Sequence, residues 1–122
     1  MPHLTLEYTQ NLAGVLDVTG ALRAVNAALL ATGIIDAPEQ LKSRAVPLDS
    51  FLVGNFETGE AFIHLRMQLM AGRSFAQRQQ LGKAAVAAVA EALKAPPGLR
   101  VQITFEAGEM LADTYQKLII TH

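Results

Sequence analysis

The chain has 122 residues, enough for one compact domain spanning residues 1–122. Ten basic and eleven acidic residues leave a net charge of -1, which excludes a general electrostatic attraction to nucleic acid or to a membrane surface. The absence of cysteine excludes disulfides, thiol catalysis and cysteine-ligated metal centres. No stretch approaches the ~20 apolar residues that span a bilayer and no signal peptide is recognisable, so we expect a cytoplasmic protein.

The chain is rich in apolar residues for its size. Counted with glycine and without tyrosine, roughly 57% of it is apolar, against a usual 45–50%. The interior of a domain of this size is too small to bury all of these apolar side chains. We therefore expect part of its surface to be covered by a partner.

The first half of the chain predicts a strand, a helix and a second strand. Residues 3–8 alternate between apolar and polar side chains, which is typical of a half-buried strand. Thr19 is placed to cap a helix and Gly33 to end it. Residues 43–53 predict the second strand, and its Pro47 indicates a sheet edge or a bulge.

The second half repeats this order after a turn at residues 54–59. Residues 61–70 alternate strictly and predict a strand. Ser74 and Gln77 have the spacing of a capping box, so a long helix should begin there and stop before Pro96. Residues 99–106 predict another strand, and residues 115–121 a last short one.

The fold class that follows is α/β in the α+β sense. Two strand–helix–strand units form one mixed sheet, and both helices cover the same face. The opposite face is left for another molecule, for which a neighbouring copy of the chain is the simplest candidate.

The start of the chain, Met1-Pro2, offers a candidate catalytic base. A small second residue permits removal of the initiator methionine, and Pro2 would then carry a secondary amine. Such an amine is too basic for proton transfer at neutral pH by about two units. Burial in an apolar pocket lined by cations would lower its pKa and would also hold an anionic substrate.

Three cations are candidates for that pocket. Arg73 follows a glycine at a strand end, beside the capped helix start, where its planar guanidinium can grip a carboxylate with two hydrogen bonds. An exposed arginine at a turn fits the local sequence equally well. Lys42 and Arg44 flank one serine, so both point to the same face of a strand; a solvated strand edge is the alternative interpretation.

The remaining titratable side chains favour ordinary structural roles. His3 and Glu7 share a strand face, but no metal-ligand spacing supports a metal site. His64 fits a satisfied histidine at a sheet surface or subunit contact. Glu106 and Glu109 could pair with arginines across an interface, although solvated carboxylates are the simpler interpretation.

Several of these segments together resemble 5-carboxymethyl-2-hydroxymuconate isomerases, a family of the tautomerase superfamily with an amino-terminal proline. The resemblance spans most of the chain. It is carried by Pro2-His3, Ala-Thr-Gly at 31–33, Lys-Ser-Arg at 42–44, Ala-Gly-Arg-Ser at 71–74 and Arg-Gln-Gln at 78–80.

The resemblance implies a homotrimer with sites near subunit contacts, two strand–helix–strand units per subunit and no cofactor. It makes Pro2 the catalytic proline and Arg73 the arginine of the Gly-Arg-Ser segment. The family's first arginine of an Arg-Ser-Arg segment is Lys42 here, and Arg44 matches the second. Lysine keeps the positive charge but cannot bind a carboxylate with the two parallel hydrogen bonds of a guanidinium. Either Arg44 therefore takes the catalytic role or the substrate differs. The segment 106–111 matches the family only loosely.

Three functions remain open from the sequence. The first is a cofactor-free keto–enol isomerase of aromatic compound catabolism, with Pro2 as base and a small, unsaturated, multiply carboxylated 2-hydroxy acid such as 5-carboxymethyl-2-hydroxymuconate as substrate. The second uses a protonated Pro2 as the acid of a hydratase or dehalogenase. The third is a non-catalytic oligomer that binds a small acid, which retention of Met1 would favour.

Overall fold

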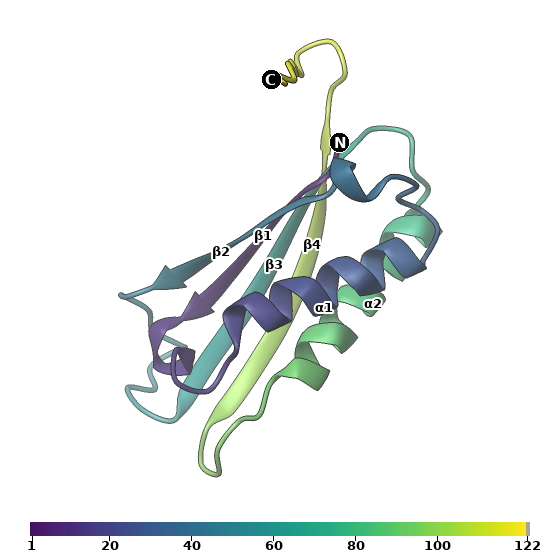
Figure 1. Cartoon of the computed structure of the whole chain (residues 1–122). Coiled ribbons are helices and arrows are strands. Elements are labelled where there is room, and N and C mark those ends of the chain that lie inside the picture. Colours follow the sequence, from purple (N-terminus) through teal and green to yellow (C-terminus); the bar gives the residue numbers. More distant parts are fainter. Residues whose placement is uncertain (122) are drawn as a thin grey trace.

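Four strands form a single mixed sheet in the computed structural model, which describes residues 1–121 (Figure 1). The strand order is β2-β1-β3-β4. The elements in chain order are β1 (His3–Thr9), the short 3-10 helix η1 (Gln10–Leu12), α1 (Val18–Ala31), η2 (Pro38–Gln40), β2 (Lys42–Leu48), β3 (Glu60–Met70), α2 (Phe75–Ala92) and β4 (Arg100–Met110).

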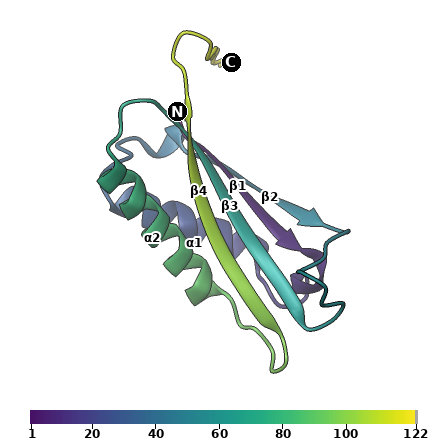
Figure 2. The same cartoon turned by 180° about the vertical axis from the view of Figure 1, so that it is seen from behind.

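Each half of the chain is a strand–helix–strand unit. β1 pairs in parallel with β2, β3 pairs in parallel with β4, and the two units join through antiparallel β1 and β3. Both helices pack on the same face of the sheet, as the two opposite views show (Figures 1 and 2). The predicted fold class is confirmed.

One hydrophobic core fills the space between the sheet and the helices. Alternate residues of β1 and β3 point into it, which is why their sequences alternate. Every third or fourth residue of each helix meets them from the other side. The fully buried apolar residues of these elements are Leu4, Leu6, Ala21, Val25, Leu29, Ala61, Ile63, Leu65, Met67, Leu69, Leu81, Ala85 and Val89.

The N-cap of helix α1 lies two residues before the predicted one, Thr19. Asp17 is the N-cap residue, and its carboxylate Oδ1 accepts a hydrogen bond from the Gly20 N–H at 3.1 Å. Thr19 lies inside the first turn, so the prediction that it caps the helix was wrong. Aspartate and threonine are both good caps, and the aspartate is the one that reaches a free amide. Gly33 follows the helix with a φ of 75°, as predicted for a helix end.

Helix α2 begins with the predicted capping box. The Ser74 hydroxyl accepts from the Gln77 N–H at 3.1 Å, and the Gln77 side chain accepts from the Ser74 N–H at 3.0 Å. Further along, Gly82 lies against the ring of Phe105 on β4, and a Cβ at this glycine would come within 2.8 Å of the ring. The missing side chain therefore lets the helix approach the sheet closely.

Strand β2 is an edge strand and is shorter than predicted. It ends at Leu48, because the chain then turns, with Val53 bridged to Phe56. Pro47 sits opposite Tyr8, and its lack of an N–H is tolerated because the outer side of β2 has no neighbour among the described strands. At the other edge, β4 runs four residues beyond its predicted end, to Met110.

The segment after β4 is not a strand. Residues 112–114 form a turn, and residues 115–121 have no regular structure, so the predicted strand at 115–121 was wrong. The segment pairs with neither edge strand of the sheet, β2 or β4. It projects instead beyond the end of the sheet where β1 begins (Figures 1 and 2).

The face of the sheet opposite the helices is polar. His64 contacts Thr104 at 2.6 Å and Glu106 at 3.1 Å, and Arg66 donates to the same Glu106 carboxylate at 2.9 Å. His64 is therefore a satisfied histidine at the sheet surface, as predicted. Across residues 1–121, neither helix is long and apolar enough to cross a membrane.

Candidate active site

The amino terminus lies at one end of the sheet, beside the first residue of β2. Pro2 is buried, and its carbonyl accepts a hydrogen bond from the Lys42 N–H at 3.1 Å. His3 is opposite Lys42 in the parallel pairing of β1 and β2. This pairing explains why two segments forty residues apart in sequence meet at the same end of the sheet.

Arg73 reaches this end of the sheet from β3. Because β3 runs antiparallel to β1, with His3 opposite Gln68, the turn after β3 returns the chain to the start of β1. Arg73 is half-buried in that turn, and its Nη1 donates to the Met70 carbonyl at 3.5 Å. The capping box already occupies the Gln77 amide, so the guanidinium is the stronger anion-binding group at this helix start.

The positive charges at this end of the sheet affect the pKa of the terminal amine. Burial is the largest cause of a lowered pKa for the Met1 amine. The positive charges of Lys42, Arg73 and Lys117 lower this pKa further, in that order, and Asp36 acts in the opposite direction. An amine held in such surroundings favours the neutral form, which is the form that can accept a proton.

Among residues 1–121, Lys42, Arg73 and Lys117 have no carboxylate partner. Within residues 1–121, the ion pairs involve other side chains, and none includes Lys42, Arg73 or Lys117. Lys42 donates instead to the Gln40 carbonyl at 2.9 Å. Three unpaired cations against the nearby carboxylates of Asp36 and Glu39 leave an excess of positive charge, which suits an anionic ligand.

Arg44 takes a different position from the one its motif suggests. Its side chain points to the same sheet face as that of Lys42, as predicted, but it is exposed and contacts His3, with Nη2 2.6 Å from Nδ1. The other ring nitrogen of His3 lies 3.0 Å from the hydroxyl of Tyr115. The structure thus brings Pro2, Lys42 and Arg73 together and places Arg44 beside them, on the histidine.

A cavity of about 630 Å³ opens at His3, the residue after Pro2, between η2, the start of β1 and β2, and the carboxy-terminal segment; of the predicted site residues, Lys42 lines it, and Pro2 and Arg73 do not. Its floor includes His3 and Lys42. The sequence predicts a strand for the carboxy-terminal segment and gives no signal that its residues line a cavity. The cavity is lined by His3, Glu39, Gln40, Lys42, Tyr115, Gln116, Lys117, Leu118 and Ile119.

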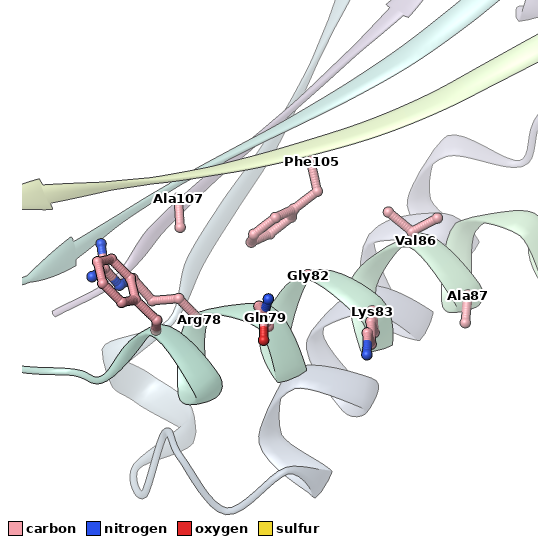
Figure 3. A pocket seen from close by; sticks show the side chains of 9 residues that line it. Arg78, Gln79, Gly82, Lys83, Val86, Ala87, Phe105 and Ala107 are labelled. Atoms are coloured by element: carbon pink, nitrogen blue, oxygen red, sulfur yellow. The ribbon is translucent and has the colours of Figure 1, made fainter.

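A second, larger hollow of about 870 Å³ lies elsewhere, between α2 and β4 (Figure 3). Phe105 points from its strand toward Gly82 of the helix, and Arg78 stacks over the exposed Phe75 ring at 4.7 Å from its centre. Glu109 lies 3.9 Å from Arg78 in the same chain. None of the predicted site residues lines this groove, so it is not the candidate active site.

No group of three or more potential metal ligands occurs among His, Asp and Glu of residues 1–121. Charge at the candidate site is supplied by lysine and arginine instead.

The sheet with two helices on one face, and the cationic cavity at its amino-terminal end, define a tautomerase-like protein. A fused 4-OT described as a symmetric trimer shares this fold, with a TM-score of 0.64, 21% identity, and coverage of 88% of this chain and 85% of the other. At this level of identity the likeness shows the fold alone.

The family is shown by closer matches. The family model described as 5-carboxymethyl-2-hydroxymuconate isomerase matches residues 2–118. A crystal structure of such an isomerase from Deinococcus radiodurans R1 is 33% identical, with a TM-score of 0.83 over 96% of this chain and 88% of the other. The chain therefore belongs to the 5-carboxymethyl-2-hydroxymuconate isomerase family, and the predicted resemblance is confirmed.

A curated relative extends this similarity. The 5-carboxymethyl-2-hydroxymuconate Delta-isomerase of Escherichia coli is 32% identical over 83 residues, which cover 68% of this chain. The match spans 65% of that relative, slightly less than two thirds of its length.

Proposed function

We propose that this chain is a cofactor-free keto–enol isomerase acting on a small unsaturated 2-hydroxy acid with more than one carboxylate, such as 5-carboxymethyl-2-hydroxymuconate. Family membership supports the reaction class. The observation that carries the proposal is the position of the buried Pro2, whose carbonyl accepts from the Lys42 N–H, at the end of the sheet where Lys42 and Lys117 line one cavity and Arg73 occupies the turn after β3. None of these three cations is paired with a carboxylate in residues 1–121.

Pro2 is the general base in this proposal. Removal of Met1 would expose its secondary amine in the place where burial and three cations already lower the pKa of the terminal amine. The nitrogen takes a proton from one end of the conjugated substrate and returns it at the other end. The electron pair left by the first transfer is delocalised onto the substrate oxygen as a dienolate, so no electrons leave the substrate.

Arg73 and Lys42 stabilise the negative charge of that dienolate and hold a substrate carboxylate. Removal of one such donor from an oxyanion site typically lowers the rate 10²- to 10³-fold. Lys42 is favoured over Arg44 for the second cation, because Lys42 lines the cavity while Arg44 is engaged with His3. Arg44 then acts as a positioning residue for His3.

The experiment compares turnover of 5-carboxymethyl-2-hydroxymuconate by the wild type, Pro2→Ala, and a form that retains Met1. We expect both altered forms to lose most of the kcat, while Pro97→Ala, in an exposed loop, retains it. Arg73→Ala should lower kcat and raise KM. Equal rates for the wild type and both altered forms would overturn the role of Pro2.

The acid mechanism of a hydratase or dehalogenase requires the opposite protonation state of Pro2. Its amine would have to stay protonated at neutral pH, with a pKa near 9, whereas an isomerase base needs one near 7 or below. The burial of Pro2 favours the neutral amine and therefore the base. A nitrogen-15 NMR titration of Pro2 decides between them, and an intact mass that includes Met1 in the native protein would favour the non-catalytic oligomer.

We further propose that the chain works as a homotrimer in the cytoplasm, in aromatic compound catabolism. The trimer is supported by the polar sheet face, which α1 and α2 leave uncovered, and by the trimeric state described for a fused 4-OT of the same fold. Sedimentation velocity should give three times the 13.1 kDa chain mass. A monomer at micromolar concentration would contradict it.

A further inference from the structure

The carboxy-terminal segment, residues 111–121, forms a wall of the cavity beside Pro2. β4 ends at Met110, at the end of the sheet where β1 begins, and the chain continues outward from there (Figures 1 and 2). Three contacts hold the segment to this end. The Tyr115 hydroxyl meets His3, and Lys117 Nζ lies 3.2 Å from the Met1 sulfur and 3.5 Å from Gln40 Oε1.

The hydrogen bonds around His3 have a defined direction. Arg44 can only donate, so the His3 Nδ1 that lies 2.6 Å from it must accept. The neutral ring therefore carries its proton on Nε2, which donates to the Tyr115 oxygen at 3.0 Å. The edge-to-face packing of the two rings, with centroids 6.1 Å apart, adds to this contact. Tyr115 is thus anchored to β1 through His3, which Arg44 of β2 contacts in turn.

Anchoring of Tyr115 determines where Lys117 lies. Two residues further on, the lysine lines the same cavity as Lys42 and contributes to lowering the pKa of the terminal amine. Its Nζ has only neutral contacts in the described chain, a thioether and an amide oxygen. Removal of Met1 would release the first of these and leave the ammonium group facing the cavity beside Pro2.

We propose that Lys117 is a specificity-determining residue that binds a second carboxylate of the substrate in the cavity that it lines together with Lys42. This inference rests on the proposed function and deepens it. It makes the site selective for acids with at least two carboxylates, because one of the two lysines is left without a counter-charge when a monocarboxylate is bound. The next residues, Leu118 and Ile119, complete the wall with apolar surface.

Binding and turnover should both be measured on the full chain. Calorimetry with tricarballylate, a saturated tricarboxylate that cannot isomerise, gives a readout that does not depend on catalysis. We expect Lys117→Met to weaken its binding about tenfold, and Lys117→Arg to restore it to within about threefold. Lys94→Met, at an exposed site after α2, is the matched control and should bind like the wild type. Butyrate, with one carboxylate, should bind all four proteins equally weakly.

Turnover separates this inference from the proposed function. For 5-carboxymethyl-2-hydroxymuconate, Lys117→Met should raise KM about tenfold with kcat within about threefold of the wild type. A protein with no isomerase activity that still shows the calorimetric difference would refute the proposed function and support the carboxylate-binding role. Equal tricarballylate affinities for Lys117→Met and Lys94→Met, or no binding by the wild type, would overturn the role of Lys117. Circular dichroism of each variant checks that the fold is retained.

Discussion

Arg44 Nη2 and His3 Nδ1 are 2.6 Å apart, and this contact separates the two cations of the Lys-Ser-Arg segment. Lys42 lines the cavity next to the amino terminus, whereas Arg44 is used to hold a histidine in its neutral form. The sequence left open which of the two serves the site. Their different neighbours lead to two predictions that can be measured independently.

The first prediction concerns the titration of His3. Burial is the largest cause of its lowered pKa, followed by the charges of Arg44, Lys42 and the amino terminus. The unfolded chain takes up a proton near the ordinary value of 6.5, before the folded chain does. Stability should therefore be unaffected by His3 above that pH and should fall as the pH drops from 6.5 through the lowered pKa.

Proton NMR of the His3 ring measures this titration directly. Arg44→Met removes a cation and a donor to Nδ1, so it should raise the pKa of His3 toward 6.5. Lys83→Met, on the exposed side of α2, is the control and should leave the titration unchanged. A lower His3 pKa in Arg44→Met would contradict the assigned direction of the hydrogen bond.

The second prediction compares the two cations in catalysis. Lys42→Met should raise KM for 5-carboxymethyl-2-hydroxymuconate and lower kcat, with a combined loss in kcat/KM of about 10²-fold, because it removes a charge that faces the substrate. Arg44→Met should cost less, about tenfold, because it acts through His3 and Tyr115. Steady-state kinetics of both variants test which one loses more of its kcat/KM. A larger loss of kcat/KM in Arg44→Met would assign the role of the second cation to Arg44.

The third prediction tests the cap of α1. Asp17→Ala removes the carboxylate that accepts from Gly20 and should lower the free energy of unfolding by about 1 kcal/mol. Thr19→Ala lies one residue inside the helix and should leave stability unchanged or raise it by up to ~0.7 kcal/mol, since alanine is the better helix former. Urea unfolding of both variants measures the difference; equal losses would restore Thr19 as a cap.

The fourth prediction concerns the contact between α2 and the sheet. An alanine at an ordinary helix position would gain about 1 kcal/mol over glycine. At Gly82 its Cβ would lie 2.8 Å from the Phe105 ring, and overpacking of this kind costs about 1–3 kcal/mol. We expect Gly82→Ala to be destabilised by about 1 kcal/mol in thermal unfolding.

Gly14→Ala is the matched control for this substitution. No atom lies within 4 Å of the added Cβ, and the residue does not have a positive φ. Its stability should stay near that of the wild type. A more stable Gly82→Ala protein would show that the Phe105 ring moves aside without cost.

The sequence by itself determined the order of the elements and the layered fold. Strict alternation over residues 61–70 fixes which side of β3 is buried, since successive side chains of a strand face opposite ways. The Ser74–Gln77 spacing places the start of α2 within one residue, because a capping box is a local contact. The Pro2, Gly-Arg-Ser and Lys-Ser-Arg segments also identified the family.

Only the tertiary structure decided how the site is assembled. Lys42 and Arg44 share one face of β2, so their spacing in the sequence makes both of them candidates for binding the substrate. They differ because Arg44 contacts His3 of the neighbouring strand. Tyr115 and Lys117 reach the site because residues 111–121 project beyond the end of the sheet where β1 begins instead of pairing at a sheet edge. A sequence pattern reflects only the local conformation of a segment. The contacts that place Tyr115 and Lys117 join residues more than a hundred positions apart, so no local pattern predicts them.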